Sequence, residues 1–115
     1  MHGLSASVNL SFLEGLVVEE VAVGPYDVQL RMEGREVVVS IVGSATAADE
    51  RHRAGPALGR ALVDLAGRTV ERVQNPGTGE LTIRFSGGFT TTLHEDEGPY
   101  ESYTISGGPE GIIVV

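Results

Sequence analysis

Apolar and polar residues alternate in several segments of this chain, the pattern of β-strands that bury one face. The alternation is clearest in residues 26–33 and 80–85. Their apolar positions are Tyr26, Val28, Leu30 and Met32 in the first segment and Leu81, Ile83 and Phe85 in the second. Further strands are predicted at 16–23, 36–42, 69–74, 89–94, 100–106 and 111–115. The aromatic residues Tyr26, Phe85 and Phe89 fall on apolar faces and are predicted in the core.

A short motif occurs twice, at an offset of 52 residues. Leu13, Gly15, Val18 and Val21 match Leu65, Gly67, Val70 and Val73. The offset is 53 across the next strand pair and 52 again where Val37, Val39 and Ile41 match Phe89, Thr91 and Leu93. Small length changes at turns are tolerated by a duplicated strand unit. The pattern predicts two pseudo-repeats, 12–42 and 64–94, each a three-stranded antiparallel meander with one apolar face.

Neither meander can easily bury its apolar face alone. The two are therefore expected to pack together as a small sandwich or barrel within one domain, residues 1–115, of mainly β (α+β) class. In each copy the motif's two valines are three residues apart, a spacing that strict alternation sends to opposite faces. A β-bulge near Glu19-Glu20 and near Glu71-Arg72 would restore a common face.

A linker and one helix are predicted between the repeats, at 43–67. Residues 43–53 are small and polar and are read as a loop. From Pro56 onward the apolar positions follow helical spacing, at Leu58, Ala61, Leu62 and Leu65. Gly67 suits a left-handed helix end. This helix is expected to cover an open end or face of the sheets.

Residues 99–115 are predicted to form a C-terminal hairpin around Gly107-Gly108-Pro109. Its last strand, 111–115, has four consecutive apolar residues and therefore two faces to bury. If this strand lies at a sheet edge, its free backbone groups favour dimerisation with a second copy, which is the preferred hypothesis. A central strand between sheet and helix is the alternative.

The charge is strongly acidic, with 16 acidic and 8 basic residues and a net charge of −8. Every basic residue is arginine, which indicates the codon bias of a GC-rich bacterial genome. Residues 94–115 contain five acids and no base, so this surface disfavours nucleic acid and would attract a basic protein partner. The same acids also serve solubility. There is no cysteine, no cationic leader and no apolar run near the length of about 20 residues of a membrane helix, so a cytoplasmic protein with no membrane contact is expected.

The acidic segment also contains two tyrosines. Tyr100 and Tyr103 fall on opposite faces of their strand, so one of them is expected at the surface beside Glu101. An exposed tyrosine can anchor a protein contact. The candidate interaction surface is Glu95, Asp96, Glu97, Tyr100, Glu101 and Tyr103.

No catalytic residue, metal ligand or cofactor is predicted. His94 adjoins acids that could share a divalent cation with it, but a run along the chain lacks converging ligand geometry, so a solvated strand end is favoured. His52 lies in a charged linker. Ser44 lacks the G-x-S-x-G elbow of hydrolases. The GTG of 77–79 lacks the lysine of a phosphate loop.

The stretches LAGRTVERV, GELTIRFSGG and YESYTI resemble an uncharacterised family of small bacterial proteins. Its pattern is a repeated L-x-G-x-x-V-x-x-V unit, a glycine hairpin and a Tyr-Glu-Ser-aromatic strand. The resemblance spans 12–115, with Tyr103 where tryptophan is expected and no aromatic residue in 43–52. It implies a bacterial origin and these boundaries, and no catalytic residue.

Together these patterns predict a non-enzymatic binding or assembly module that acts through protein–protein contacts, possibly with itself. One alternative is an immunity protein that neutralises a basic toxin. Another is a small-molecule or metal-dependent enzyme that uses His94 and its neighbouring acids.

Overall fold

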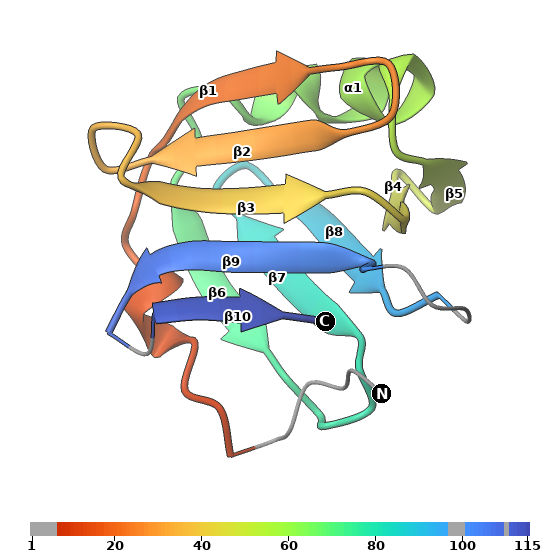
Figure 1. Ribbon diagram of the computed structural model, residues 1–115. Coiled ribbons are helices and arrows are strands. Elements are labelled where there is room, and N and C mark those ends of the chain that lie inside the picture. Colours follow the sequence, from red (N-terminus) through yellow and green to blue (C-terminus); the bar gives the residue numbers. More distant parts are fainter. Residues whose placement is uncertain (1–6, 97–100, 110) are drawn as a thin grey trace.

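The chain folds into two antiparallel sheets of five strands each, packed face to face (Figure 1). The computed structural model describes residues 7–96, 101–109 and 111–115. The first sheet has the order β1 (Val18–Val23), β2 (Val28–Met32), β3 (Val37–Ile41), β9 (Tyr103–Gly108) and β10 (Gly111–Val114). The second has the order β5 (Glu50–Arg53), β4 (Ser44–Ala47), β8 (Phe89–His94), β7 (Leu81–Phe85) and β6 (Val70–Gln74). The predicted mainly β class is confirmed, as an open sandwich.

The core lies between the two sheets, where the apolar faces of the two meanders meet as predicted. Along β2 and β3, buried and half-buried residues alternate at every position. Leu30 of the first meander is 0% exposed and Ile83 of the second is 1% exposed. Fully burying one such side chain is worth about 1.5–3 kcal/mol, so the shared core is the main source of stability.

The two halves are related by a pseudo-two-fold axis that passes near Val17 and Thr69. These two residues, 52 apart, form an isolated antiparallel bridge. The flanking hydrogen bonds are reciprocal. The amide of Gly15 donates to the carbonyl of Val70 at 2.8 Å, and the amide of Gly67 donates to that of Val18 at 2.7 Å. Both glycines have a left-handed φ, 90° and 87°, which explains why the motif keeps glycine there.

The predicted bulges are present at matching places. The pairing of β1 with β2 shifts between Val18 and Glu20, and the pairing of β6 with β7 shifts between Val70 and Arg72. One extra residue on the edge strand of each meander lets both valines of its motif face the core.

The prediction that 43–53 is a loop is wrong, because these residues form the hairpin β4–β5. Each half therefore has five strands, and each half gives its second hairpin to the other half's sheet. Strand β4 pairs with β8, from Ser44↔His94 to Ala47↔Thr91. Strand β9 pairs with β3, from Ile41↔Tyr103 to Val38↔Ser106. The exchange ties the halves together.

The predicted helix is present as α1 (Pro56–Leu62), followed by the 3-10 turn η2 (Val63–Leu65). It contacts β1 of one sheet and β4 and β5 of the other, so it covers one open side of the sandwich (Figure 1). Gly59 lies directly against Val23 of β1. A matching 3-10 turn, η1 (Ser11–Leu13), precedes β1 and contacts β6.

One predicted core residue is misplaced. Tyr26 is 81% exposed, because β2 begins only at Val28 and Tyr26 belongs to the preceding turn. Phe85 is fully buried, and Phe89 packs against the core while the guanidinium of Arg68 stacks over its ring at 4.5 Å.

Candidate functional site

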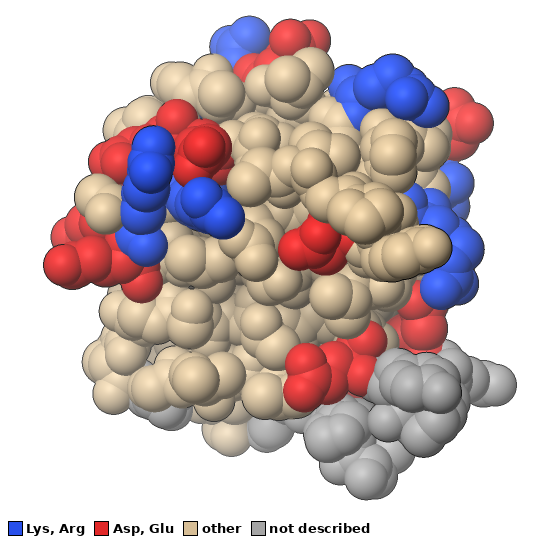
Figure 2. Space-filling model, turned by 45° about the horizontal axis from the view of Figure 1, so that its top comes forward, with Lys and Arg blue, Asp and Glu red and all other residues tan. Residues whose placement is uncertain are grey.

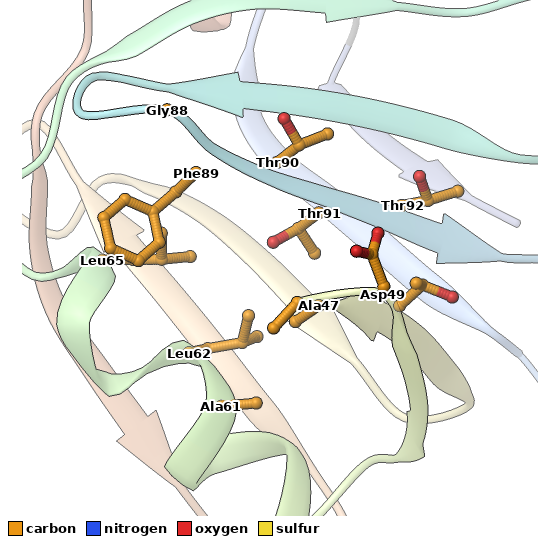
Figure 3. Close-up of a pocket in the computed structure, with 12 residues that line it drawn as sticks. Ala47, Asp49, Ala61, Leu62, Leu65, Gly88, Phe89, Thr90, Thr91 and Thr92 are labelled. Carbon is orange, nitrogen blue, oxygen red and sulfur yellow. The ribbon is translucent and has the colours of Figure 1, made fainter.

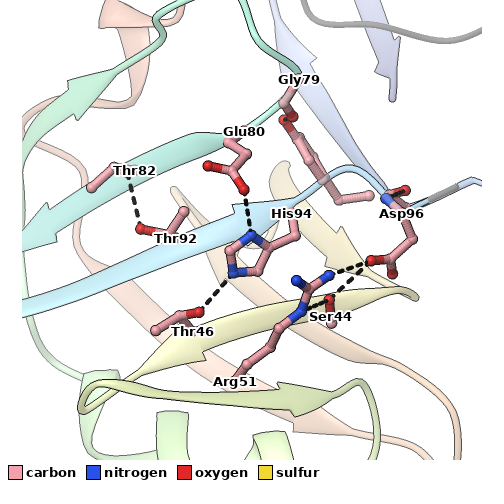
Figure 4. A network of polar contacts seen from close by, with 11 residues as sticks. Ser44, Thr46, Arg51, Gly79, Glu80, Thr82, Thr92, His94 and Asp96 are labelled. Atoms are coloured by element: carbon pink, nitrogen blue, oxygen red, sulfur yellow. Dashed lines mark hydrogen bonds and ion pairs between the residues drawn. The ribbon is translucent and has the colours of Figure 1, made fainter.

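A polar network joins three strands of the second sheet around His94, at the end of β8 (Figure 4). The imidazole Nδ1 lies 2.7 Å from Oε2 of Glu80, and Nε2 lies 2.6 Å from Oγ1 of Thr46. The His94 side chain is 12% exposed. A carboxylate, an imidazole and a hydroxyl are thus aligned in the order of a nucleophile-activating triad.

A second part of the network surrounds Asp96. The guanidinium of Arg51 donates to Oδ1 of Asp96 at 2.7 Å and to Oγ of Ser44 at 2.9 Å. The Ser44 hydroxyl donates to the same carboxylate oxygen at 3.1 Å. The amide of Asp96 donates to Oγ of Ser102 at 2.8 Å. These contacts fix the loop after β8 to the β4–β5 hairpin.

The triad-like order lacks the other parts of a hydrolase site. Thr46 lies on β4, between β5 and β8, where the sheet ladders take up the backbone amides that would have to form an oxyanion hole. Within the described ranges, no group of three or more histidine and acidic side chains could hold a metal ion. The network is best explained as a clasp that joins β4, β7 and β8.

The predicted interaction surface is only partly at the surface. Tyr103 is fully buried, so its place in that surface is wrong. Its hydroxyl donates to the carbonyl of Gly79 at 2.7 Å. Burial raises the pKa of Tyr103 far above its ordinary value, and the charges of Glu95 and Glu80 raise it further.

The acids of this segment differ in their exposure. Glu101 is exposed. Glu95 and Asp96 are half-buried, and each has one carboxylate oxygen buried without a hydrogen-bond partner among the described residues. Glu97 and Tyr100 lie outside the described residues. The exposed acidic charge of the described part of this segment is therefore smaller than its composition suggests.

The C-terminal strand β10 lies at the edge of the first sheet, the position on which the dimer hypothesis depends. The other edge strands carry charged residues, which are Glu19 and Glu20 on β1, Glu50, Arg51 and Arg53 on β5, and Glu71 and Arg72 on β6. Strand β10 has none, and its Ile112 is 71% exposed. Charged side chains are a common protection of sheet edges against pairing, so β10 is the unprotected edge.

The outer face of the first sheet continues this uncharged surface. The outward positions of β3, β9 and β10 are Val38, Ser40, Thr104, Ser106, Ile112 and Val114. Figure 2 shows a broad area of the molecule without charged side chains, with most of the arginines and acids towards its margins. An edge strand and an adjoining face without charges can be covered with little desolvation cost.

The sequence reasoning missed the clasp because it read 43–53 as a loop. The signal was present, since Ser44 and Thr46 alternate with Ala45 and Ala47. The alanines face the core and the hydroxyl residues face the network. Alanine gives too little apolar contrast for this alternation to stand out.

No helix in the described parts of the chain is both long and apolar enough to cross a membrane. Comparisons with protein families, with curated proteins and with solved structures find no match to this chain. The candidate sites therefore rest on their own geometry.

Proposed function

We propose that this protein is a non-enzymatic assembly module that pairs with a second copy of itself through β10. The main support is that β10 is an edge strand without a charged residue, while the three other edge strands have charged residues. Two copies related by a two-fold axis would join their β10 strands antiparallel and extend the sheet across the dimer. Ile112 of each copy would then be partly covered by side chains of the partner's strand.

The immunity-protein alternative is less favoured. It depends on a dense acidic surface in 94–115, but Asp96 is paired with Arg51 and Glu95 is half-buried. Glu101 is the exposed acid of the described part of that segment. We also propose a bacterial cytoplasmic setting, which the arginine-only basic composition and the lack of cysteine favour.

Self-association is tested by multi-angle light scattering and sedimentation equilibrium across a wide concentration range. The wild-type chain is expected to form dimers, and Ile112→Lys is expected to weaken the dimer by about tenfold or more, because two like charges would face each other near the axis. Val63→Lys is the matched control, since Val63 is also exposed (54%) but lies on η2, away from β10.

Both variants should keep the circular dichroism spectrum of the wild type, which shows that they fold. A wild-type chain that stays monomeric at the highest concentrations would overturn the proposal. Equal weakening by Ile112→Lys and Val63→Lys would show that the contact lies elsewhere.

A further inference from the structure

A pocket of about 480 Å³ lies between the α1–η2 segment and strands β4 and β8 (Figure 3). This volume falls within the range of about 300–1,000 Å³ that is usual for small-molecule sites. Apolar side chains line its inner part, among them Ala47, Leu62, Leu65 and Phe89. Asp49 is the one charged residue of its lining.

The pseudo-symmetry shows what fills the corresponding space in the other half. Gly88 and Phe89 of the pocket match Glu36 and Val37, against which Gly107 packs so tightly that a Cβ would collide with their backbone. The next residue, Gly108, lies directly against the ring of Phe12. In the first sheet, chain from the longer β9–β10 hairpin and an aromatic ring thus cover this region.

The second sheet lacks these groups at the corresponding place. Strand β4 ends at Ala47, and Ala48 and Asp49 turn the chain away with left-handed φ angles of 53° and 63°. The residue that matches Phe12 is Asp64, which is exposed. Ala47 itself matches the much larger Ile105. The pocket forms because the β4–β5 hairpin is short, Ala47 has a small side chain and Asp64 stands where the first sheet has the ring of Phe12.

Thr91 gives the pocket a polar group beside the apolar side chains of its inner part. Its side chain is 2% exposed and points from β8 towards Ala47 and the α1 side, whereas Thr90 and Thr92 point the other way (Figure 3). No hydrogen bond joins its hydroxyl to another described residue. The matching residue is Val39, fully buried in the core. A hydroxyl in the wall of a pocket can donate a hydrogen bond to a bound ligand or accept one from it.

We propose that this pocket binds a small aromatic compound that carries an amino group. The ring of the ligand would lie against Phe89, Leu62 and Leu65. In the first sheet, Gly107, Gly108 and the ring of Phe12 cover the corresponding space. The amino group would donate to the Thr91 hydroxyl and to the carboxylate of Asp49, which has no ion pair with a described residue. An extended peptide is disfavoured, because the turn at Ala48–Asp49 stands where an added strand would continue.

The test uses 2-phenylethylamine as the probe and phenylacetate as its anionic counterpart, each titrated into the labelled full-length protein and followed by amide NMR shifts. The amine is expected to shift the signals of β8 and η2 residues in a saturable way, and phenylacetate to bind several-fold more weakly because Asp49 repels it. Ala47→Ile is expected to abolish binding, since it restores the residue found in the other half. Thr91→Val is expected to weaken binding several-fold.

The control is Thr78→Val, the same change in the exposed loop between β6 and β7, which should leave the affinity unchanged. Thermal melting establishes that each variant folds, and Ala47→Val replaces Ala47→Ile if the larger side chain prevents folding.

Absence of a saturable shift, shifts centred elsewhere, or equal affinity in a folded Ala47 variant would overturn the proposal. Tighter binding of phenylacetate would overturn the role of Asp49. Because β10 lies in the other sheet, these outcomes are independent of the dimer.

Discussion

At the scale of single residues, the two tyrosines in the described part of the chain differ in exposure because one lies before a strand and the other within one. Tyr26 continues the alternation of β2 but precedes its first paired residue, so it lies in solvent. Tyr103 has the same residue type and is fully buried, because it is a paired residue of β9 whose side chain faces the core between the sheets. Alternation predicts which residues share a face, but not where the strand begins.

Tyr103 should make stability depend on alkaline pH. Its folded-state pKa lies above the unfolded value of about 10, so its contribution is fully present below about pH 10 and is lost as the pH rises towards the folded-state pKa. We expect the free energy of unfolding, measured in urea, to fall more steeply above about pH 10 in the wild type than in Tyr103→Phe.

Below that pH, Tyr103→Phe should cost about 1–3 kcal/mol, because the carbonyl of Gly79 loses its donor. Tyr26→Phe is the matched control, since Tyr26 is exposed, and it should change neither the stability nor its pH dependence. An identical alkaline decline in the wild type and in Tyr103→Phe would contradict this account.

At the scale of secondary-structure elements, the sequence predicted those elements in which apolar and polar residues differ clearly along the chain. The three-residue spacing of the paired valines correctly predicted a bulge in β1 and in β6. Strand β4 was missed because its inward residues, Ala45 and Ala47, barely differ in hydropathy from their neighbours. Helix α1 was found from its leucine spacing, although Gly59 weakens that signal.

Gly59 is expected to be required by packing, although glycine disfavours a helix. Alanine would gain about 1 kcal/mol of helix propensity, but its Cβ would collide with the stiff, β-branched Val23, and overpacking costs about 1–3 kcal/mol. Gly59→Ala should therefore lower the free energy of unfolding by up to about 2 kcal/mol.

A double-mutant cycle separates these two effects. Combined with Val23→Ala, the Gly59→Ala change should become neutral or stabilising, because the space opened by the smaller side chain accepts the new Cβ. Urea unfolding of the four proteins gives the coupling energy. A more stable Gly59→Ala single variant would refute the close contact between α1 and β1.

At the scale of the whole molecule, the repeat was visible in the sequence but the exchange of hairpins was not. The two meanders match at offsets of 52 and 53, whereas Ser44 and Ser102, which pair with matching ends of β8 and β3, are 58 apart. The longer connection between β8 and β9 hides this second part of the repeat. The order of the strands along the chain also does not show which sheet a hairpin joins, because β3 and β8 each have a free side at which a hairpin could pair.

The exchange makes each half depend on the other for a complete sheet. Alone, residues 1–54 would leave β3 without β9 and would leave the β4–β5 hairpin without β8, so most of the apolar face of the meander would remain in water. The same holds for residues 55–115. We expect each fragment to show no cooperative thermal transition by circular dichroism, and an equimolar mixture to regain the β spectrum and the dispersed NMR signals of the intact chain.

The intact chain, carried through the same handling, is the control. The core residues of both halves form one packed cluster. Unfolding of the full chain should therefore be a single transition in which both sheets are lost together. A monomeric fragment that folds cooperatively by itself would mean that the exchanged hairpins are dispensable. Two separate transitions in the full chain would lead to the same conclusion, with each half then stable as a three-stranded meander.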